Sequence, residues 1–505
     1  MTLTQLEKEE KEIGKKLYDY QHNAIDSIFT YINNNPTNYN LLYQLPTGGG
    51  KTVIFSEIAR RYIETTQKRV LILTHRIELS KQTSNMLTEF GVKNKIIDSN
   101  VKEITTKDNF DCFVAMVETL NNRLKEEKVE ISDIGMVIVD EAHYNSFRKL
   151  FKYFEECFIL GVTATPLSSN ITLPMHEIYN DLIVGENIRS LIERGFLAKA
   201  TTHSFNVNLT SLKIGMNGDY TVKSSEELYV QSTMQTKLLA AYEQQSLGKK
   251  TLIFNNGINT SRFVYYTFLK AGYDIKYIDN TNTKEERKKI LHWFKHTPNA
   301  ILTSVGILTT GFDEPTIDAI IINRATRSLA LYFQMIGRGS RVINDKNSFK
   351  ILDLGNNVAR FGLWTDDIDW RHIFKNPNYY LENLSSDEEI EKRFSYELPD
   401  EVREMFSKSE DISYDVKAEY KEMIRTHQKT KLVLEKSVEQ HAKMCAENSE
   451  DVFDAQILSR ELNDDIAYRI KQYSYCIMKS SNNYIKWLEE DYKRKLRVKI
   501  SQEFN

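Results

Sequence analysis

The sequence predicts an α/β protein with two tandem lobes, each built on a parallel β-sheet, followed by a mostly α-helical C-terminal domain. Between residue 17 and about residue 360, short apolar runs alternate with helical patterns in two successive series. Such alternation is typical of βαβ units, which place parallel strands in one sheet. After Asn376 the chain is highly charged, nearly free of Gly and Pro, and helical in its periodicity, which indicates a separate helical domain.

The chain is 505 residues long, which exceeds what one hydrophobic core usually serves, so several domains are expected. The expected segments are an N-terminal lead-in helix (1–16), a first lobe (17–200), a linker or small insertion (201–235), a second lobe (236–375) and a helical accessory domain (376–505). The linker segment is more polar than its neighbours and carries turn residues. Within the accessory domain, Ser386 and Glu389 have the spacing of a capping box and predict a helix start.

The strands of each lobe are expected at apolar runs bounded by helical stretches. Those of the first lobe are Leu41–Leu45, Val70–Thr74, Cys112–Met116, Met136–Asp140 and Phe158–Val162. Those of the second lobe are Thr251–Phe254, Ile275–Ile278, Ala300–Ser304, Ala319–Asn323 and Phe349–Leu354.

Composition excludes some classes of protein. The formal net charge is -3, whereas a protein that coats nucleic acid passively is usually basic. A local basic cleft remains possible, because side chains and backbone N–H groups can grip phosphate. None of the four cysteines lies in a CxxC pair, so neither a zinc site nor a disulfide framework is predicted. We expect a reducing, cytoplasmic and nucleoid-associated location, since no apolar run is long enough for a membrane span and the N-terminus lacks a secretory h-region.

The run LPTGGGKT predicts a P-loop, because it follows the first expected strand and precedes a helical pattern. Its glycines let backbone N–H groups face phosphates, and the helix N-terminus adds a positive dipole end. We expect Lys51 to neutralise the β- and γ-phosphates of ATP and Thr52 to ligate Mg²⁺. Leu45 stands where the general pattern has its first glycine. The residues expected to hold the nucleotide here are Pro46, Thr47, Gly48, Gly49, Gly50, Lys51 and Thr52.

A second motif, MVIVDEAH over 136–143, ends an apolar strand in two carboxylates. Such a pair behind a P-loop indicates a Walker B site. Asp140 is expected to hold the hydrated Mg²⁺, and Glu141 to orient and deprotonate the attacking water.

These two motifs belong to an ordered series that resembles the superfamily 2 helicases over about residues 17–360. LYDYQHNAI places Gln21 where the family reads adenine, and TSVGILTTGFDEP supplies Gly311 and Asp313, which in the family approach the nucleotide. QMIGRGSR supplies Gln334, Arg338 and Arg341. The resemblance implies two RecA-like lobes and an ATPase stimulated by nucleic acid. A guanidinium fork stabilises the charge that phosphoryl transfer spreads over oxygens. Because the two arginines belong to the second lobe, the full site would form only when the lobes close.

The resemblance also implies coupling and nucleic-acid residues. GVTATP and the DEAH histidine would couple hydrolysis to lobe movement through His143, Thr163 and Thr165. ILTHRIEL, VAMVETL, TLIFNNGI and TSVGILTT look like nucleic-acid motifs, although Glu118 stands where relatives usually have Gln. The residues implied are Thr74, His75, Arg76, Thr119, Asn255, Thr303 and Ser304.

The motif pattern looks closer to the RadD-like and XPB/UvsW-like DNA branch than to DEAH-type RNA helicases, whose final motif usually reads QRxGRxGR. Two departures weaken a closer assignment. No four-cysteine zinc module of the RadD-like kind follows the lobes, and the expected first lobe starts near residue 17, without a UvsW-like DNA-reading domain.

Several weaker patterns have a plainer interpretation. Pro399–Asp400 and Glu419–Lys421 match PD…ExK of restriction-type nucleases, but the ExK lies in a charged, helical run. The basic tail DYKRKLRVKI could reach phosphate, although a solvated helix is favoured. The acidic run 365–369 is expected to be a loop or helix cap, and Trp364 and Trp370 are expected in the core rather than stacked on bases.

The sequence thus predicts an ATP- and Mg²⁺-dependent DNA helicase or translocase, acting on branched or single-stranded-containing DNA in repair, recombination or replication. An RNA helicase is one alternative. Another is the motor subunit of a restriction or defence complex, in which the helical domain would bind a protein partner. A degenerate nucleotide-binding protein is disfavoured because every expected catalytic residue is present.

Overall fold

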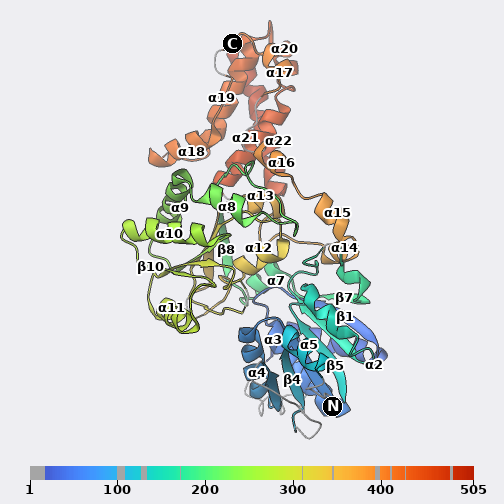
Figure 1. Cartoon of the computed structure of the whole chain (residues 1–505). Coiled ribbons are helices and arrows are strands. Elements are labelled where there is room, and N and C mark those ends of the chain that lie inside the picture. The colour runs from blue at the N-terminus through green and yellow to red at the C-terminus, as the bar shows by residue number, and fades with distance from the viewer. Residues whose placement is uncertain are drawn as a thin grey trace. The chain divides into compact units, whose positions relative to one another are not determined.

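The structure is a computed structural model, and it describes residues 17–98, 109–126, 133–170, 172–309, 311–343, 346–392, 398–409, 412–426, 428–477 and 482–504. The expected lead-in helix over 1–16 lies outside these residues. The chain divides into two compact units. One comprises Met1–Ala200 with Ser211–Leu384, and the other comprises Thr201–Thr210 with Ser385–Asn505. Figure 1 shows two helix-flanked sheets in the first unit and a bundle of helices in the second.

The first lobe is a seven-stranded sheet in which every pairing is parallel. Its strand order is β3-β4-β2-β5-β6-β1-β7. The strands are β1 (Tyr39–Gln44), β2 (Arg69–Thr74), β3 (Asn94–Ile97), β4 (Cys112–Met116), β5 (Ile134–Asp140), β6 (Phe158–Thr163) and β7 (Asp181–Val184). The five expected strands are present. The two edge strands, β3 and β7, were not expected, because each has four residues and carries polar or partly exposed side chains that hide the apolar signal.

Helices connect these strands and bury one apolar face each. In α3, the face formed by Ile54, Phe55, Ile58 and Tyr62 is buried, as a helical period of 3.6 residues requires. The helices of the lobe are α2 (Asp19–Asn34), α3 (Lys51–Thr66), α4 (Ile77–Glu89), α5 (Val117–Lys125), α6 (Arg148–Phe151) and α7 (Ile188–Glu193).

The second lobe repeats this plan, with the strand order β10-β11-β9-β12-β13-β8. The strands are β8 (Lys199–Ser204), β9 (Thr251–Asn255), β10 (Ile275–Ile278), β11 (Ile301–Val305), β12 (Ala319–Asn323) and β13 (Ser348–Asp353). The four pairings from β10 to β13 are parallel. The start of β8 joins the outer edge, where Lys199 N donates to the carbonyl of Asn347.

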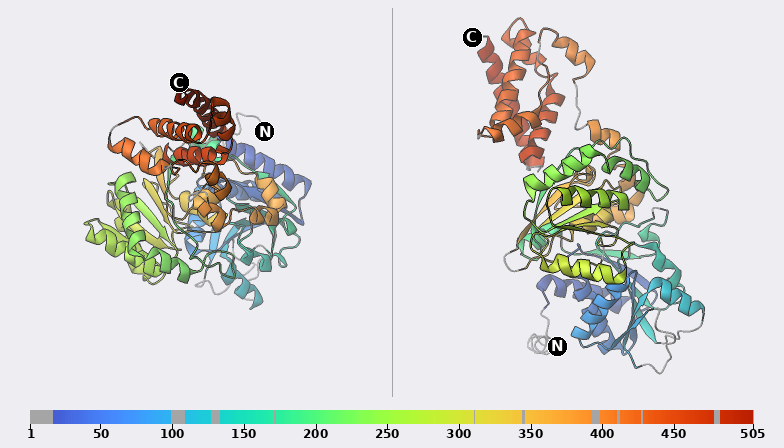
Figure 2. Two further views of the ribbon diagram at one scale, coloured as in Figure 1. Left: turned by 90° about the horizontal axis from the view of Figure 1, so that it is seen from above. Right: turned by 60° about the vertical axis from the view of Figure 1, so that its left-hand side comes forward.

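The helices of the second lobe flank its sheet, as Figure 2 shows. They are α8 (Val222–Tyr229), α9 (Ser232–Gln245), α10 (Ile258–Lys270), α11 (Lys284–His296), α12 (Leu329–Ile336) and α13 (Asn357–Phe361). The first turn of α11 shows why its sequence starts a helix there. Thr283 Oγ1 accepts from the Glu286 N–H, and the Glu286 carboxylate accepts from the Thr283 N–H, so two N–H groups that lack helical partners are satisfied. Two short helices, α14 (Trp370–Lys375) and α15 (Pro377–Glu382), end the first unit.

The second unit is helical. Its elements are α16 (Asp387–Lys392), α17 (Asp400–Met405), α18 (Val416–Arg425), α19 (Leu432–Glu447), α20 (Val452–Leu458), α21 (Asn463–Ile477) and α22 (Asn482–Glu503). The long helices α19, α21 and α22 lie side by side around their own core. The expected capping box is present at the start of α16, because Ser386 and Glu389 exchange hydrogen bonds. The α/β fold class with a helical C-terminal region is therefore confirmed.

The plainer interpretations of the weak patterns also hold. Trp364 and Trp370 are buried, and Asp369 caps α14 by accepting from the His372 N–H. The ExK pattern lies inside α18 rather than on a strand. The basic tail lies in α22, where Lys499 pairs with Glu439. Among the helices of the described residues, none combines the length and apolar character needed to cross a membrane.

Candidate nucleotide and nucleic-acid site

The P-loop connects β1 to α3, and its glycines are required by its conformation. Gly48 and Gly50 have φ values of 94° and 85°, in the left-handed region that favours glycine. A Cβ atom on Gly50 would lie 2.6 Å from Nε2 of Gln21, so this amide would have to move to admit a larger residue. Lys51 Nζ donates to the carbonyl of Leu45 at 3.3 Å. Leu45, the departure from the general pattern, thus contributes its backbone to the site.

Aromatic side chains surround Gln21. Tyr20 is buried, which raises its pKa to about 12, and its hydroxyl donates to the P-loop carbonyl of Gly49 at 2.8 Å. Phe196 lies with its ring centroid 5.1 Å from that of Tyr20 and 4.4 Å from that of Tyr18. The Arg194 guanidinium lies over the rings of Tyr20 and Phe196. Sequence reasoning missed this cluster, although the tyrosine directly before Gln21 in LYDYQ was a usable signal.

The carboxylates of Asp140 and Glu141 lie at the carboxyl end of β5. Strand β5 pairs with β6, which in turn pairs with β1, the strand that precedes the P-loop. Burial and the adjacent charge of Glu141 raise the pKa of Asp140 to about 7, while Lys51 opposes the rise. Burial alone would raise the pKa of Glu141, but the charge of Lys51 holds it below its ordinary value. Glu141 has a φ of 54°, and such backbone strain in a non-glycine residue is concentrated at functional sites.

A chain of hydrogen bonds joins His143 to both lobes. His143 Nδ1 lies 3.0 Å from Thr163 Oγ1, which in turn donates to the carbonyl of Thr165. Since that hydroxyl proton is committed, His143 Nδ1 is the donor and its Nε2 is an acceptor. Gln334, from α12 of the second lobe, places its amide Nε2 3.3 Å from His143 Nε2. Burial lowers the pKa of His143, so the neutral ring required by this chain is the favoured form.

Of the two arginines of the second lobe, Arg341 lies against the first lobe and Arg338 bonds to a loop of its own lobe. Arg341 Nη1 is 2.6 Å from the position that a Cβ on Gly48 would take, and Arg341 Nε donates to Asp313 Oδ1 at 2.9 Å. Gly337 lies against Thr47 of the P-loop in the same way. Arg338 donates to the carbonyls of Thr309 and Phe312, on either side of Gly311, and burial lowers its pKa to about 10. The guanidinium of Arg341 therefore faces the P-loop, whereas Arg338 holds the loop that carries Gly311 and Asp313.

Several buried polar atoms at this site have no hydrogen-bond partner. They are Thr47 Oγ1, Thr165 Oγ1 and Glu141 Oε2. Buried polar groups are normally satisfied, so unpaired ones beside a P-loop fit a triphosphate and the water that attacks it. Mg²⁺ commonly takes one or two protein oxygens and completes its shell with phosphate oxygens and water. The Thr52 hydroxyl and the Asp140 carboxylate are oxygen donors of that kind. Within the described ranges, no three His, Cys, Asp or Glu side chains gather as they would around a metal ion.

The predicted nucleic-acid residues fall into two groups. Four of them have buried side chains: Thr74, Asn255, Thr303 and Ser304. Asn255 is held inside the sheet by Thr303 and by Asn323 of the neighbouring strand. Nucleic-acid contact through these four side chains, which are buried in the structure, stays a prediction. Thr119 is partly exposed at the start of α5.

The contacts of Arg76 and His75 are not those of side chains that are free to bind phosphate. Arg76 donates through Nη1 to the carbonyl of Ile307 at 3.0 Å and through Nη2 to that of Gly306 at 3.2 Å. Both carbonyls follow β11 in the second lobe. His75 packs on the ring of Tyr144, with the centroids 4.4 Å apart.

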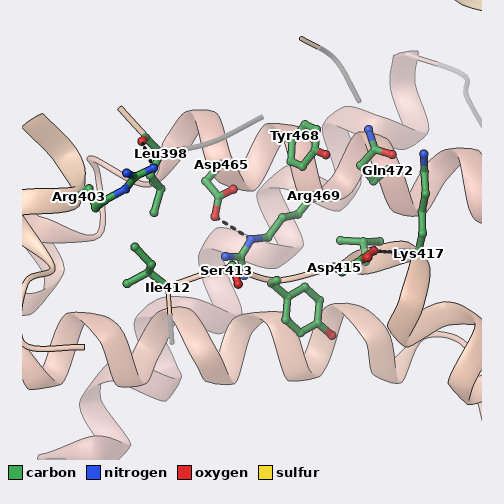
Figure 3. Close-up of a pocket in the computed structure, with 12 residues that line it drawn as sticks. Leu398, Arg403, Ile412, Ser413, Asp415, Lys417, Asp465, Tyr468, Arg469 and Gln472 are labelled. Carbon is green, nitrogen blue, oxygen red and sulfur yellow. Dashed lines mark hydrogen bonds and ion pairs between the residues drawn. The ribbon is translucent and has the colours of Figure 1, made fainter. Parts of the chain in front are cut away.

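The second unit contains a separate pocket of about 600 Å³, shown in Figure 3. Arg469 reaches into it from α21, with Nε 2.7 Å from Asp465 Oδ2. The same guanidinium donates to Ser437 and Gln440. Because Arg469 is occupied by these groups of the helical unit, it supports the packing of α21 on α19.

The P-loop, the buried carboxylate pair and an arginine from a second parallel sheet define a two-lobed P-loop ATPase. The family described as Type III restriction enzyme, res subunit, matches residues 14–168, and the Helicase conserved C-terminal domain matches residues 232–342. These two matches, together with relatives named ATP-dependent helicase, support assignment of the chain to the superfamily 2 helicases.

Individual relatives agree with this assignment. The Putative ATP-dependent helicase IRC3 of Saccharomyces cerevisiae is 29% identical over 358 residues, which are 67% of this chain and 51% of that protein. This chain thus spans about half the length of that relative. A fragment of a putative HsdR subunit of a type I restriction enzyme from Vibrio vulnificus YJ016 has a TM-score of 0.53 at 23% identity, over 66% of this chain and 63% of that one. The Type ISP restriction-modification enzyme LlaBIII bound to DNA has a TM-score of 0.51 at 13% identity, over 97% of this chain and 43% of that one. The two structures support the fold.

A conservative change at Tyr20 tests the aromatic cluster. We expect Tyr20→Phe to raise the KM for ATP about fivefold with little change in kcat, because it removes a buried hydrogen bond to the Gly49 carbonyl but keeps the ring. Steady-state ATPase kinetics measure both constants. Tyr18→Phe is the matched control, since Tyr18 is half exposed and its ring contact with Phe196 remains. An unchanged KM in Tyr20→Phe would show that this hydroxyl does not shape the loop.

Proposed function

We propose that the chain is a nucleic-acid-stimulated ATPase that moves on or remodels DNA. The observation that carries the proposal is the position of Arg341 of the second lobe, with Nη1 against Gly48 of the P-loop. A nucleotide bound between the two lobes couples its hydrolysis to their relative movement, because the charged groups that bind the nucleotide come from both lobes. The preferred DNA is branched or contains single strands, and the process is repair, recombination or replication.

The proposed roles follow from this placement. Lys51 and the P-loop N–H groups hold the β- and γ-phosphates, while Thr52 and Asp140 hold Mg²⁺, which neutralises charge on the phosphates. Glu141 accepts the proton of the attacking water. Arg341 stabilises the charge that develops on the transferred phosphoryl group.

The remaining roles concern recognition and coupling. Gln21, with the aromatic cluster beside it, recognises the base. Gln334 senses the nucleotide state through His143, since it is the second-lobe residue at the end of the His143–Thr163 hydrogen-bond chain. Arg338 keeps Gly311 and Asp313 in place by holding the carbonyls around them.

An ATPase assay across nucleic acids tests the function. We expect turnover to rise about tenfold or more with forked or single-stranded DNA, and less with RNA of matched sequence. The assay compares single strands, duplexes, forks, four-way junctions and RNA at one salt concentration, because phosphate contacts make affinity strongly salt-dependent. Stronger stimulation by RNA than by every DNA would replace the DNA proposal with an RNA helicase.

A second candidate function is the motor subunit of a restriction or defence complex. The match to a family described as a restriction-enzyme subunit favours it, as does the fold shared with HsdR. In that case the helical unit binds a protein partner. Absence of nucleic-acid stimulation in the purified chain, with stimulation restored by a co-purifying protein from the native source, would favour this candidate.

A further inference from the structure

Three aromatic rings form a stack beside the DEAH motif. The centroid of His75 lies 4.4 Å from that of Tyr144, and the centroid of Tyr144 lies 4.3 Å from that of His143. The interplanar angles are 41° and 38°, so neighbouring rings are in contact but tilted relative to each other. His75 comes from the loop after β2, while Tyr144 and His143 come from the loop after β5.

The ring contact of His75 is with Tyr144. Both ring nitrogens are buried and have no hydrogen-bond partner. Burial lowers the pKa of His75 to about 4, so the ring is neutral near pH 7. A buried ring with two unpaired polar atoms is costly to keep and calls for an explanation other than packing, because an aliphatic or phenyl side chain would pack without that cost.

Each end of the stack is next to a contact with the second lobe. At one end, Arg76 donates to the carbonyls of Ile307 and Gly306. At the other end, His143 meets Gln334 of α12 and lies with Nδ1 3.4 Å from Oε2 of Glu141. The Gln334 side chain also lies beside the Tyr144 hydroxyl. The rings of His75 and Tyr144 thus form a continuous contact path from the loop at 74–76 to His143, which lies beside Glu141.

We propose that the His75–Tyr144–His143 stack is a positioning element that transmits lobe closure from the 74–76 loop, where Arg76 binds second-lobe carbonyls, to Glu141, and so sets how strongly nucleic acid stimulates ATP hydrolysis. This inference rests on the proposed function. It also changes the role of His75, which acts through Tyr144 and not by touching nucleic acid. Coupling of this kind needs packed groups that can adopt two arrangements. Separation and closure of the lobes would provide the two arrangements, because they break and form the two second-lobe contacts.

The test separates ring packing from direct contact. His75→Phe keeps a stacking ring and removes the nitrogens, whereas His75→Leu removes the ring. We expect the ratio of DNA-stimulated to unstimulated kcat to fall about tenfold in His75→Leu, within the range of energetic coupling between sites, and to be retained in His75→Phe. Binding of a fluorescent single-stranded oligonucleotide, measured with a non-hydrolysable ATP analogue, is expected to stay within about twofold of the parent in both variants. Tyr144→Leu is expected to lower the ratio as His75→Leu does, and Tyr153→Leu, an exposed tyrosine of the same lobe, is the control.

The outcomes are distinct. Loss of oligonucleotide binding in His75→Phe would mean that the imidazole contacts nucleic acid, and the inference would be wrong. A normal ratio in His75→Leu would overturn it as well. If His75→Leu does not fold by its thermal transition, the ratios of His75→Phe and Tyr144→Leu decide, since the stack requires the first to be normal and the second to be low. Absence of stimulation in the unaltered chain would instead refute the proposed function, which keeps the two failures apart.

Discussion

Replacing Glu141 by Gln is expected to lower kcat for ATP by about a thousandfold, while ATP binding is retained. The amide keeps the size of the side chain but cannot accept a proton from water. In the structure Glu141 Oε2 is buried without a hydrogen-bond partner, and Lys51 holds the pKa of the carboxyl low, so the group is an ionised acceptor near pH 7. Single-turnover hydrolysis and binding of a fluorescent ATP analogue measure the two properties separately.

The control for this change is Glu64→Gln. Glu64 is an exposed carboxylate on α3 that pairs with Arg60, so its loss should leave hydrolysis unaltered. Hydrolysis at the parent rate in Glu141→Gln would show that another group activates the water. Loss of both analogue binding and hydrolysis would show that the variant disturbs the P-loop. The thermal transition would then tell a local change from unfolding of the protein.

Replacing Arg341 by Ala is the second large effect. We expect kcat to fall about a thousandfold, in the range measured for arginines that stabilise transferred phosphoryl groups, with a much smaller change in KM for ATP. The reason is geometric, because Arg341 belongs to the second lobe but its Nη1 lies against Gly48 of the first. The positive charge of Arg341 lies where negative charge develops during the reaction. A lysine lacks the planar guanidinium fork, so Arg341→Lys should recover little of the lost kcat.

Steady-state ATPase kinetics with saturating DNA measure this effect. The matched control is Arg189→Ala, an exposed arginine paired with Asp367, which should hydrolyse ATP normally. Arg338→Ala offers a contrast, since that side chain holds the carbonyls of Thr309 and Phe312. We expect it to lower kcat and thermal stability together, whereas Arg341→Ala should lower kcat alone. Equal kcat in Arg341→Ala and the parent would rule out Arg341 as the second-lobe residue in the reaction.

Much of the site was predictable because its residues are local in sequence. The P-loop, the DEAH run and the QMIGRGSR run each place several functional groups within eight residues. The edge strands β3 and β7 were not predictable, because four residues with polar side chains give no clear period. The aromatic cluster at Tyr20 was missed for another reason, since Phe196 and Arg194 are far from it in sequence.

The nucleic-acid assignments show the limit of motif reasoning. The motif places Thr74 and Asn255 at strand ends, but it does not say which way the side chains point. In the structure both side chains are buried, and Asn255 bonds to Thr303 and Asn323 of the neighbouring strands. Arg76 donates to two backbone carbonyls of the second lobe, which lie 230 and 231 residues further along the chain.

By itself, the sequence determined the two-lobed α/β fold and the nucleotide chemistry, because hydrophobic period and short motifs are properties of neighbouring residues. Only the tertiary structure decided which arginine faces the P-loop, which histidine nitrogen is a donor, and that His75 stacks on Tyr144. Those facts depend on the packing of segments that are distant in the chain. Packing gives different contacts to side chains, such as Arg338 and Arg341, that look equivalent in the sequence.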